Sequence, residues 1–109
     1  MISDRGNSDF AHHLREIGDK WVDADAAARM YEETKSAILA QKKAELGDIP
    51  DNKAERLVKA SSFWMDFITE GVRVRTEANR LKIQLEEIKM RHMIMQSREA
   101  TERSERKMI

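Results

Sequence analysis

The segment KMRHMIM, Lys89 to Met95, concentrates side chains that are able to bind a soft metal ion. Its three methionines and His92 offer thioether and imidazole ligands, which copper favours. A metal site needs three or four ligands on one face, and helical residues two positions apart point in different directions. We therefore expect no metal and no cofactor here. Two interpretations remain: helix packing, with methionine as an adaptable filler, or an exposed surface for a partner protein.

Other residues in the chain are equally poor candidates for catalysis. His12 and His13 are adjacent, so they point about 100° apart on a helix and do not chelate one ion together. Acidic pairs such as Glu32 and Glu33 have lysine or arginine nearby, which is typical of a solvated helix face. There is no cysteine, no phosphate-binding glycine loop and no nucleophile elbow. We expect a non-enzymatic protein without a small-molecule substrate.

A heptad pattern indicates the element that carries KMRHMIM. From Trp64 to Met95 apolar residues recur in alternating steps of three and four, as at the a and d positions of a coiled coil. Glu70 and Glu77 fall at g, and Arg75 falls at e, so opposite charges flank this seam. The expected interaction seam is Trp64, Phe67, Val74, Leu81, Leu85, Ile88 and Met95, with Gly71, Ala78 and His92 at its other positions.

The first half of the chain carries a matching stripe. Its members are Phe10, Leu14, Ile17, Trp21, Ala24, Ala28, Tyr31 and Ile38. Lys35 and Lys42 interrupt the stripe, and Gly18 leaves open whether this arm is one helix or two. Residues 1–51 hold seven lysines and arginines against eleven acids, whereas residues 73–109 hold ten against six. The two arms therefore attract each other, and an antiparallel hairpin buries both stripes.

Turn signals divide the chain between these arms. Gly47 is placed to end a helix and Pro50 to begin another, with Asn52 and Glu55 as a capping box. A serine at 61 or 62 is placed to cap the long helix. We predict one helical domain over residues 1–109, with a first arm at 8–46, a turn at 47–52, a short helix at 53–60, a long helix at 62–104 and a frayed tail at 105–109.

The long helix becomes apolar on more than one face toward its C-terminal end. Met90 and Ile94 lie on a second face, together with Ile83, and Met93 lies between the two faces. A helix with two apolar faces needs more than one packing partner. We therefore predict a partner-binding face at Met90, Met93 and Ile94, and an oligomeric helical bundle.

Nucleic-acid binding is the alternative function. Arg73, Arg80 and Arg91 lie on the basic long helix and are possible phosphate contacts. Six glutamates are interleaved with the basic residues, and no aromatic residue after Phe67 is available for base stacking. A mixed, solvated face explains the same pattern.

Cellular location is suggested only by what the sequence lacks. It contains no run of about 18 apolar residues, and MISDRGNSDF lacks the regions of a signal peptide. We expect a cytoplasmic protein that does not contact membranes.

Several blocks resemble a known group of proteins. WVDADAAARMYEETKSAILAQ, LGDIP, KAERLVKAS, RTEANRLKIQLEEIKMR and SREAT, within residues 21–101, are similar to small helix-rich proteins of phages and prophages, encoded near DNA recombination and replication genes. This group has no assigned activity, so the resemblance transfers no catalytic or binding residue. It implies a phage context, a bacterial host and an accessory role.

These observations predict a self-associating helical accessory protein that binds protein partners. It would act as an adaptor or an inhibitor of a recombination, replication or defence component. The alternatives are a nucleic-acid-binding protein that uses the basic helix and a structural coiled-coil component of a particle.

Overall fold

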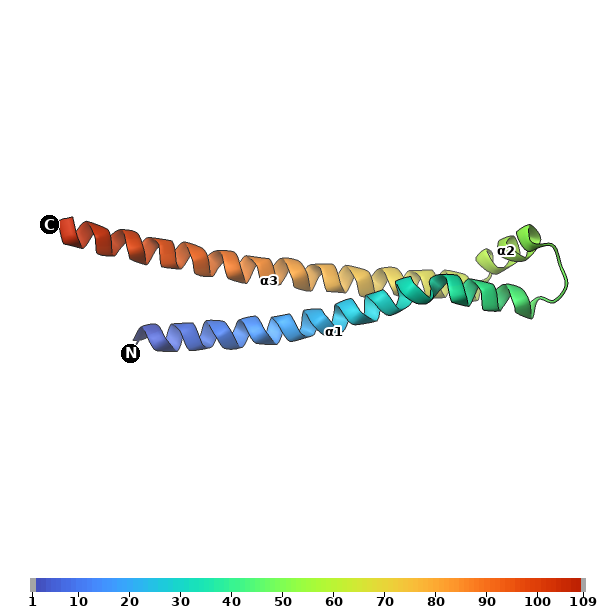
Figure 1. Cartoon of the computed structure of the whole chain (residues 1–109), viewed down its shortest axis with the longest axis horizontal. Coiled ribbons are helices and arrows are strands. Elements are labelled where there is room, and N and C mark those ends of the chain that lie inside the picture. The colour runs from blue at the N-terminus through green and yellow to red at the C-terminus, as the bar shows by residue number, and fades with distance from the viewer. Residues whose placement is uncertain (1, 109) are drawn as a thin grey trace. The chain divides into compact units, whose positions relative to one another are not determined.

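The computed structural model describes residues 2–108 of the chain, and the side chains of residues 9–108. Its helices are α1 (Ile2–Glu45), α2 (Asp51–Lys59) and α3 (Ser62–Met108), shown in Figure 1. The described residues include no β-strand. The structure therefore confirms the predicted all-α helical hairpin, in which α1 and α3 pack against each other.

The contacts within the chain group into two compact units. The turn unit is Val22–Asn79 and contains the second half of α1, all of α2 and the start of α3. The terminal unit joins Met1–Trp21 to Arg80–Ile109. The sequence predicted one domain, and the division has a simple cause: contacts between paired long helices are local along their length.

Gly47 ends the first helical arm, as predicted. Its φ of +85° is a left-handed conformation that glycine adopts without a Cβ clash. The Gly47 N–H donates to the Ala44 carbonyl at 3.1 Å, and the Leu46 N–H donates to the Lys43 carbonyl at 3.2 Å. These bonds satisfy carbonyl groups at the helix end, which would otherwise lack partners.

Pro50 directly precedes α2, and the capping box predicted at Asn52 and Glu55 is not formed. The fixed φ of proline, −54° here, already suits a helix start, and the Pro50 carbonyl accepts the Ala54 N–H at 2.9 Å. The helix therefore begins at Asp51, one residue before the predicted cap, and no side chain caps it. Glu55 instead pairs with Lys59 at 3.0 Å.

Ser61 is the predicted serine cap of α3. Its hydroxyl oxygen accepts the Trp64 N–H at 3.2 Å, and its O–H donates to the Val58 carbonyl at 2.5 Å. One side chain therefore satisfies the end of α2 and the start of α3. This double contact allows the two helices to follow each other with only two residues between them.

Both long helices extend further than the sequence predicted. α1 begins at Ile2 and continues through Gly18 without a break, because Gly18 faces Leu85 and is flanked by seam residues. α3 continues to Met108, through most of the tail predicted to fray. Its last turns contain good helix formers with alternating charges, which favour helix even without packing. Residue 109 lies outside the described residues.

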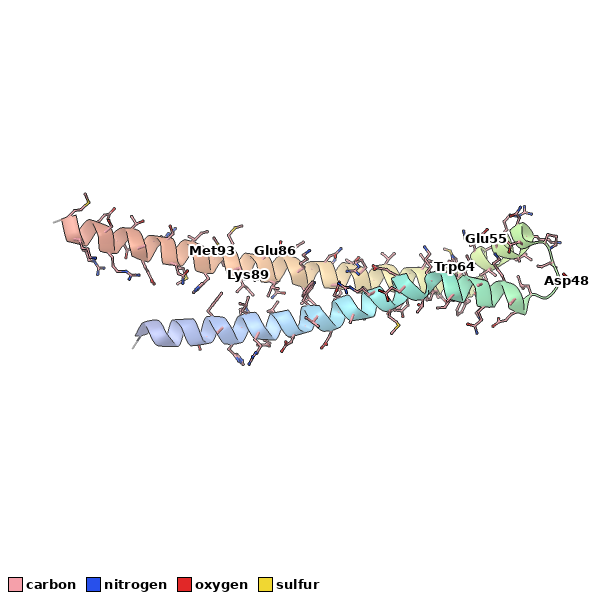
Figure 2. All side chains as sticks on the ribbon, in the orientation of Figure 1. Asp48, Glu55, Trp64, Glu86, Lys89 and Met93 are labelled. Carbon is pink, nitrogen blue, oxygen red and sulfur yellow. The ribbon has the colours of Figure 1, made fainter. Side chains whose placement is uncertain are left out.

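The buried core lies almost entirely in the turn unit. Trp64 is only 6% exposed, lies near the start of α3 (Figure 2), and packs on Phe67 with ring centroids 5.6 Å apart. α2 adds a third helix to this unit and supplies two buried side chains. The buried residues of the turn unit are Ala28, Ala54, Val58, Trp64, Val74 and Ala78. In the described part of the terminal unit only Ile17 is buried, because two helices alone enclose little volume.

We expect Trp64→Ala to lower the free energy of unfolding by about 3 to 5 kcal/mol, because it leaves a large cavity in the turn unit. The measurement is urea denaturation followed by helical circular dichroism. Met65→Ala is the matched control: the neighbouring Met65 is exposed, so its loss should change stability by less than about 0.5 kcal/mol. Equal effects of the two substitutions would contradict the core described here.

Alanine substitution at two glycines should have opposite effects on stability. Gly47→Ala should lower the free energy of unfolding by about 1 kcal/mol, because alanine is strained in the left-handed backbone conformation of this residue. No neighbouring atom lies within 4 Å of the added Cβ, so backbone strain is the whole cost. Gly18→Ala should raise it by about 0.5 to 1 kcal/mol, since a Cβ there lies 4.0 Å from Leu85 Cδ1 and alanine favours helix. Urea denaturation of both variants measures the two changes in the free energy of unfolding. If both variants are stabilised or both are destabilised, the backbone conformation given for one of the two glycines is wrong.

Candidate interaction surface

The seam of the turn unit is closely packed around Tyr31. The Tyr31 and Phe67 ring centroids are 5.3 Å apart. A Cβ built on Gly71 would lie 3.5 Å from the Tyr31 Cβ, so glycine at this position lets the two helices approach closely. Trp64 and Val74 are buried on the same side of α3. These predicted seam residues therefore pack within the chain, and little of their surface is exposed for contact with a partner protein.

Arg75 makes the main polar contact between α1 and α3 in the turn unit. Its Nε donates to Glu32 Oε1 at 2.6 Å, and its Nη1 donates to Asp25 Oδ1 at 2.9 Å. The hydrogen bond from Arg75 lowers the pKa of Glu32, and the bonds to Glu32 and Asp25 raise the pKa of Arg75. The predicted complementary charge beside the seam is thus present, and Arg75 holds two acids one heptad apart on α1.

Arg73, a predicted phosphate contact, is engaged by acids of its own helix. Its Nε donates to Glu70 at 3.0 Å, and its Nη1 lies 3.6 Å from Glu77 Oε2. The hydrogen bond from Arg73 lowers the pKa of Glu70. Arg80 and Arg91 are exposed and form no ion pair with any residue that the structure describes. Of the three arginines, Arg73 is therefore paired with acids of its own helix, whereas Arg80 and Arg91 are not.

Lys42, which interrupts the stripe of α1, is accommodated by an aromatic ring. Its Nζ lies 4.2 Å from the centroid of the Phe63 ring and 3.3 Å from Glu45 Oε2. The lysine stem covers apolar surface while the ammonium group meets a π face and a carboxylate. The heptad pattern could not reveal this contact, because Phe63 lies outside the a and d positions.

In the terminal unit His92 packs against an aromatic ring. The rings of His92 and Phe10 are stacked, with centroids 3.7 Å apart and planes 9° from parallel. Leu81, Leu85 and Ile88 are half-buried along the same stretch of α3. His92 therefore acts as a seam residue. Among the described residues, no group of three or more His, Cys, Asp or Glu side chains is placed to hold a metal ion.

Met95 does not continue the seam within this chain. It is 59% exposed, although its heptad position predicts packing against α1. Phe10 faces His92, so the part of α1 level with Met95 is the segment at residues 2–8. The sequence of that segment, ISDRGNS, offers one large apolar residue. Among the described side chains, the seam of the terminal unit therefore ends at His92.

The exposed large apolar side chains of α3 in the terminal unit include four that we call the outer face: Ile83, Met90, Met93 and Ile94. Met90 is 63% exposed and Met93 is 67% exposed. Met93 and Glu86 lie on the side of α3 that faces away from α1 (Figure 2). The predicted partner face at Met90, Met93 and Ile94 is therefore uncovered within this chain. None of the helices in the described residues is long and apolar enough to cross a membrane.

The stabilisation from the Arg75 contacts should disappear in acid. The pKa of Glu32 is lower in the folded chain, so its contribution is complete above the ordinary pKa of 4.5 and is lost as pH falls through the lowered pKa. Glu32→Gln should therefore lower the melting temperature at pH 7 and have a smaller effect at pH 3. Thermal melts at both values check this.

Glu33→Gln is the matched control for the acid melts. Glu33 is the exposed neighbour of Glu32 and forms no ion pair with a described residue, so its substitution should give no pH-dependent difference. A Glu32→Gln effect that is the same at both pH values would contradict the ion cluster.

Comparisons with known proteins were made at three levels. The chain matches no protein-family model, no curated protein and no solved structure.

Proposed function

We propose that this chain is a non-enzymatic interaction protein that binds protein partners, a second copy of itself included, through the outer face of α3. The exposure of Ile83, Met90, Met93 and Ile94 carries this proposal. The opposite side of the same helix is already packed, at Leu85 and His92 among others, so these four side chains form a second apolar surface. Adjacent exposed apolar residues mark sites of protein association, and methionine adapts to the shape of its partner.

The cellular role that we propose is that of a phage or prophage accessory protein. In this role the chain acts in the cytoplasm of a bacterial host, as an adaptor or an inhibitor of a recombination, replication or defence component. The support comes from the sequence blocks within residues 21–101 that resemble small phage proteins. A binding face without a catalytic site suits either role, because both act by occupying a surface of another protein.

Nucleic-acid binding is the second candidate, and one observation favours it. Arg80 and Arg91 are exposed and form no ion pair with a described residue, so their guanidinium groups are free to contact phosphates. Glu86 and Glu87 lie between them on the same helix and repel a polyanion. The two candidates differ in their response to salt, because phosphate contacts weaken steeply as salt is added.

We expect Met93→Glu to weaken protein binding at least about tenfold, because it places a charge in an apolar contact. The wild-type and variant chains, each carrying an affinity tag, would be used to recover partners from a phage-infected bacterial lysate, followed by titration of the recovered protein. Circular dichroism melts should be unchanged, since Met93 is exposed.

Met30→Glu is the matched control. Met30 is 65% exposed on α1 in the turn unit, so the same change is made at the same exposure away from the outer face. If Met93→Glu binds as well as Met30→Glu does, the outer face is not the binding site. Salt-sensitive binding of a labelled single-stranded oligonucleotide, lost when Arg80 and Arg91 become alanine, would favour the second candidate instead.

A further inference from the structure

We infer that the occupant of the outer face is a second copy of this chain, bound antiparallel along residues 83–104 of α3. The inference rests on the proposed function, because it names the partner of the same face. It places a two-fold axis between Met93 and Ile94. The two copies would then contact each other through the same residues, as in a closed dimer.

In the register of the terminal unit, the last turns of α3 lie beyond the described start of α1. Phe10 faces His92 and Gly18 faces Leu85, so the residue numbers of facing pairs add to 102 or 103. Ile2, the first described residue of α1, is therefore level with residue 100 or 101 of α3, which continues to Met108. Figure 1 shows the end of α3 extending beyond the start of α1. A lone helix gains stability when another helix packs on it.

The outer face has a large-residue half and a small-residue half. The steps of three and four that connect Ile83, Met90 and Met93 continue onto smaller residues: Ser97, Ala100, Thr101 and Ser104. A shallow hollow occupies part of this small-residue half, and its lining residues are Ile94, Ser97, Arg98, Thr101, Glu102 and Glu105. One helix thus carries both projecting side chains and a surface able to receive them.

Antiparallel pairing brings the two kinds of half together. With the axis between Met93 and Ile94, facing residues have numbers that add to 187. Met90 of one copy then meets Ser97 of the other, and Ile83 meets Ser104. Large side chains oppose small ones, as close helix packing requires. The same arrangement covers the last turns of each α3 with the outer face of its partner.

The charges on the two halves are complementary in this register. Glu86 and Glu87 lie within the large-residue half, whereas Arg98 and Arg103 flank the small-residue half. Glu87 comes within two residues of the level of Arg98 on the second copy, and Glu86 comes within two residues of its Arg103, offsets of about 3 Å that these long side chains can span. Arg98 forms no ion pair with a described residue, and Arg103 lies 4.0 Å from its nearest carboxylate oxygen, on Glu99. Because the dimer is two-fold symmetric, each of these two ion pairs forms twice in the interface.

The accessible surface leaves ample area for such an interface. The chain exposes 8971 Å² at a mass of 12.7 kDa. A compact monomer of this mass exposes about 6,200 Å². A stable dimer buries about 600 to 1,000 Å² on each chain, which is well within the difference.

Charge reversal tests the inference. Sedimentation equilibrium should give the wild-type chain twice its mass of 12.7 kDa. Glu87→Arg and Arg98→Glu should each weaken the dimer at least about tenfold, because each places like charges face to face. The double variant restores opposite charges and should return to within about threefold of the wild type. Glu33→Arg, an exposed reversal in the turn unit, should leave the mass unchanged.

A cross-link provides a second readout that does not depend on charge. The chain has no cysteine, so Met90→Cys and Ser97→Cys in one variant introduce the only two thiols. They lie about 10 Å apart along one helix, too far for a disulfide within the chain. Oxidation should give a covalent dimer, detected on a non-reducing gel. The pair Met30→Cys and Ala37→Cys, with the same spacing on exposed positions of α1, should give none.

Three results would overturn the inference: a monomer at all concentrations, a dimer that ignores Glu87→Arg, or a double variant that fails to recover. The proposed function fails separately. If the chain is monomeric and Met93→Glu still abolishes binding of a different protein, the proposed function stands and only the second copy is rejected. If Met93→Glu affects neither self-association nor capture of other proteins, both proposals are rejected.

Discussion

Burial of one narrow apolar stripe between two antiparallel helices is the constraint on which this structure depends. The chain is 37% charged and only 6% aromatic, so each long helix can devote a single face to packing. Gly71 against Tyr31 and His92 against Phe10 show two ways to bring the helices together: removal of a side chain, and stacking of flat rings. Only α2 adds a third packing surface, and the buried core is concentrated around it.

The flanks of the stripe differ between the two units. In the turn unit Arg75 on α3 meets Asp25 and Glu32 on α1. In the terminal unit the same flank carries Lys82 and Lys89 on α3, whereas the α1 positions one and two heptads before Asp25 are Gly18 and Ala11. Arg75 is thus paired with two acids within the chain. The terminal unit combines unmatched charge with the exposed outer face, and this combination is why the proposed interactions are assigned there.

The segment KMRHMIM contributes to two different surfaces of α3. His92 packs in the seam, whereas Met90, Met93 and Ile94 are uncovered on another side of the helix. Neighbouring residues of one short segment therefore serve different surfaces, because successive helical positions point about 100° apart. The methionines and His92 of this segment are therefore divided between an exposed side and a packed side of the helix.

Features that depend on local geometry could be predicted from the amino-acid pattern alone. The heptad spacing predicted which side of α3 is buried from Trp64 to His92. Gly47 predicted the end of α1 because only a residue without a Cβ readily adopts its left-handed backbone, and Ser61 predicted a cap because its hydroxyl reaches nearby backbone groups. Each of these features arises within a few residues of the chain.

Which residues of the two arms face each other became known only from the folded chain. The ring stack of Phe10 on His92, the choice of Asp25 and Glu32 as partners of Arg75, and the exposure of Met95 all follow from this register. The register depends on where α1 ends, on how α2 and Ser61 return the chain, and on which side chains then fit together. Periodicity assigns a residue to one face of its helix. It does not identify the residue opposite on the other helix, because the two are far apart in the sequence and only the complete fold brings them together.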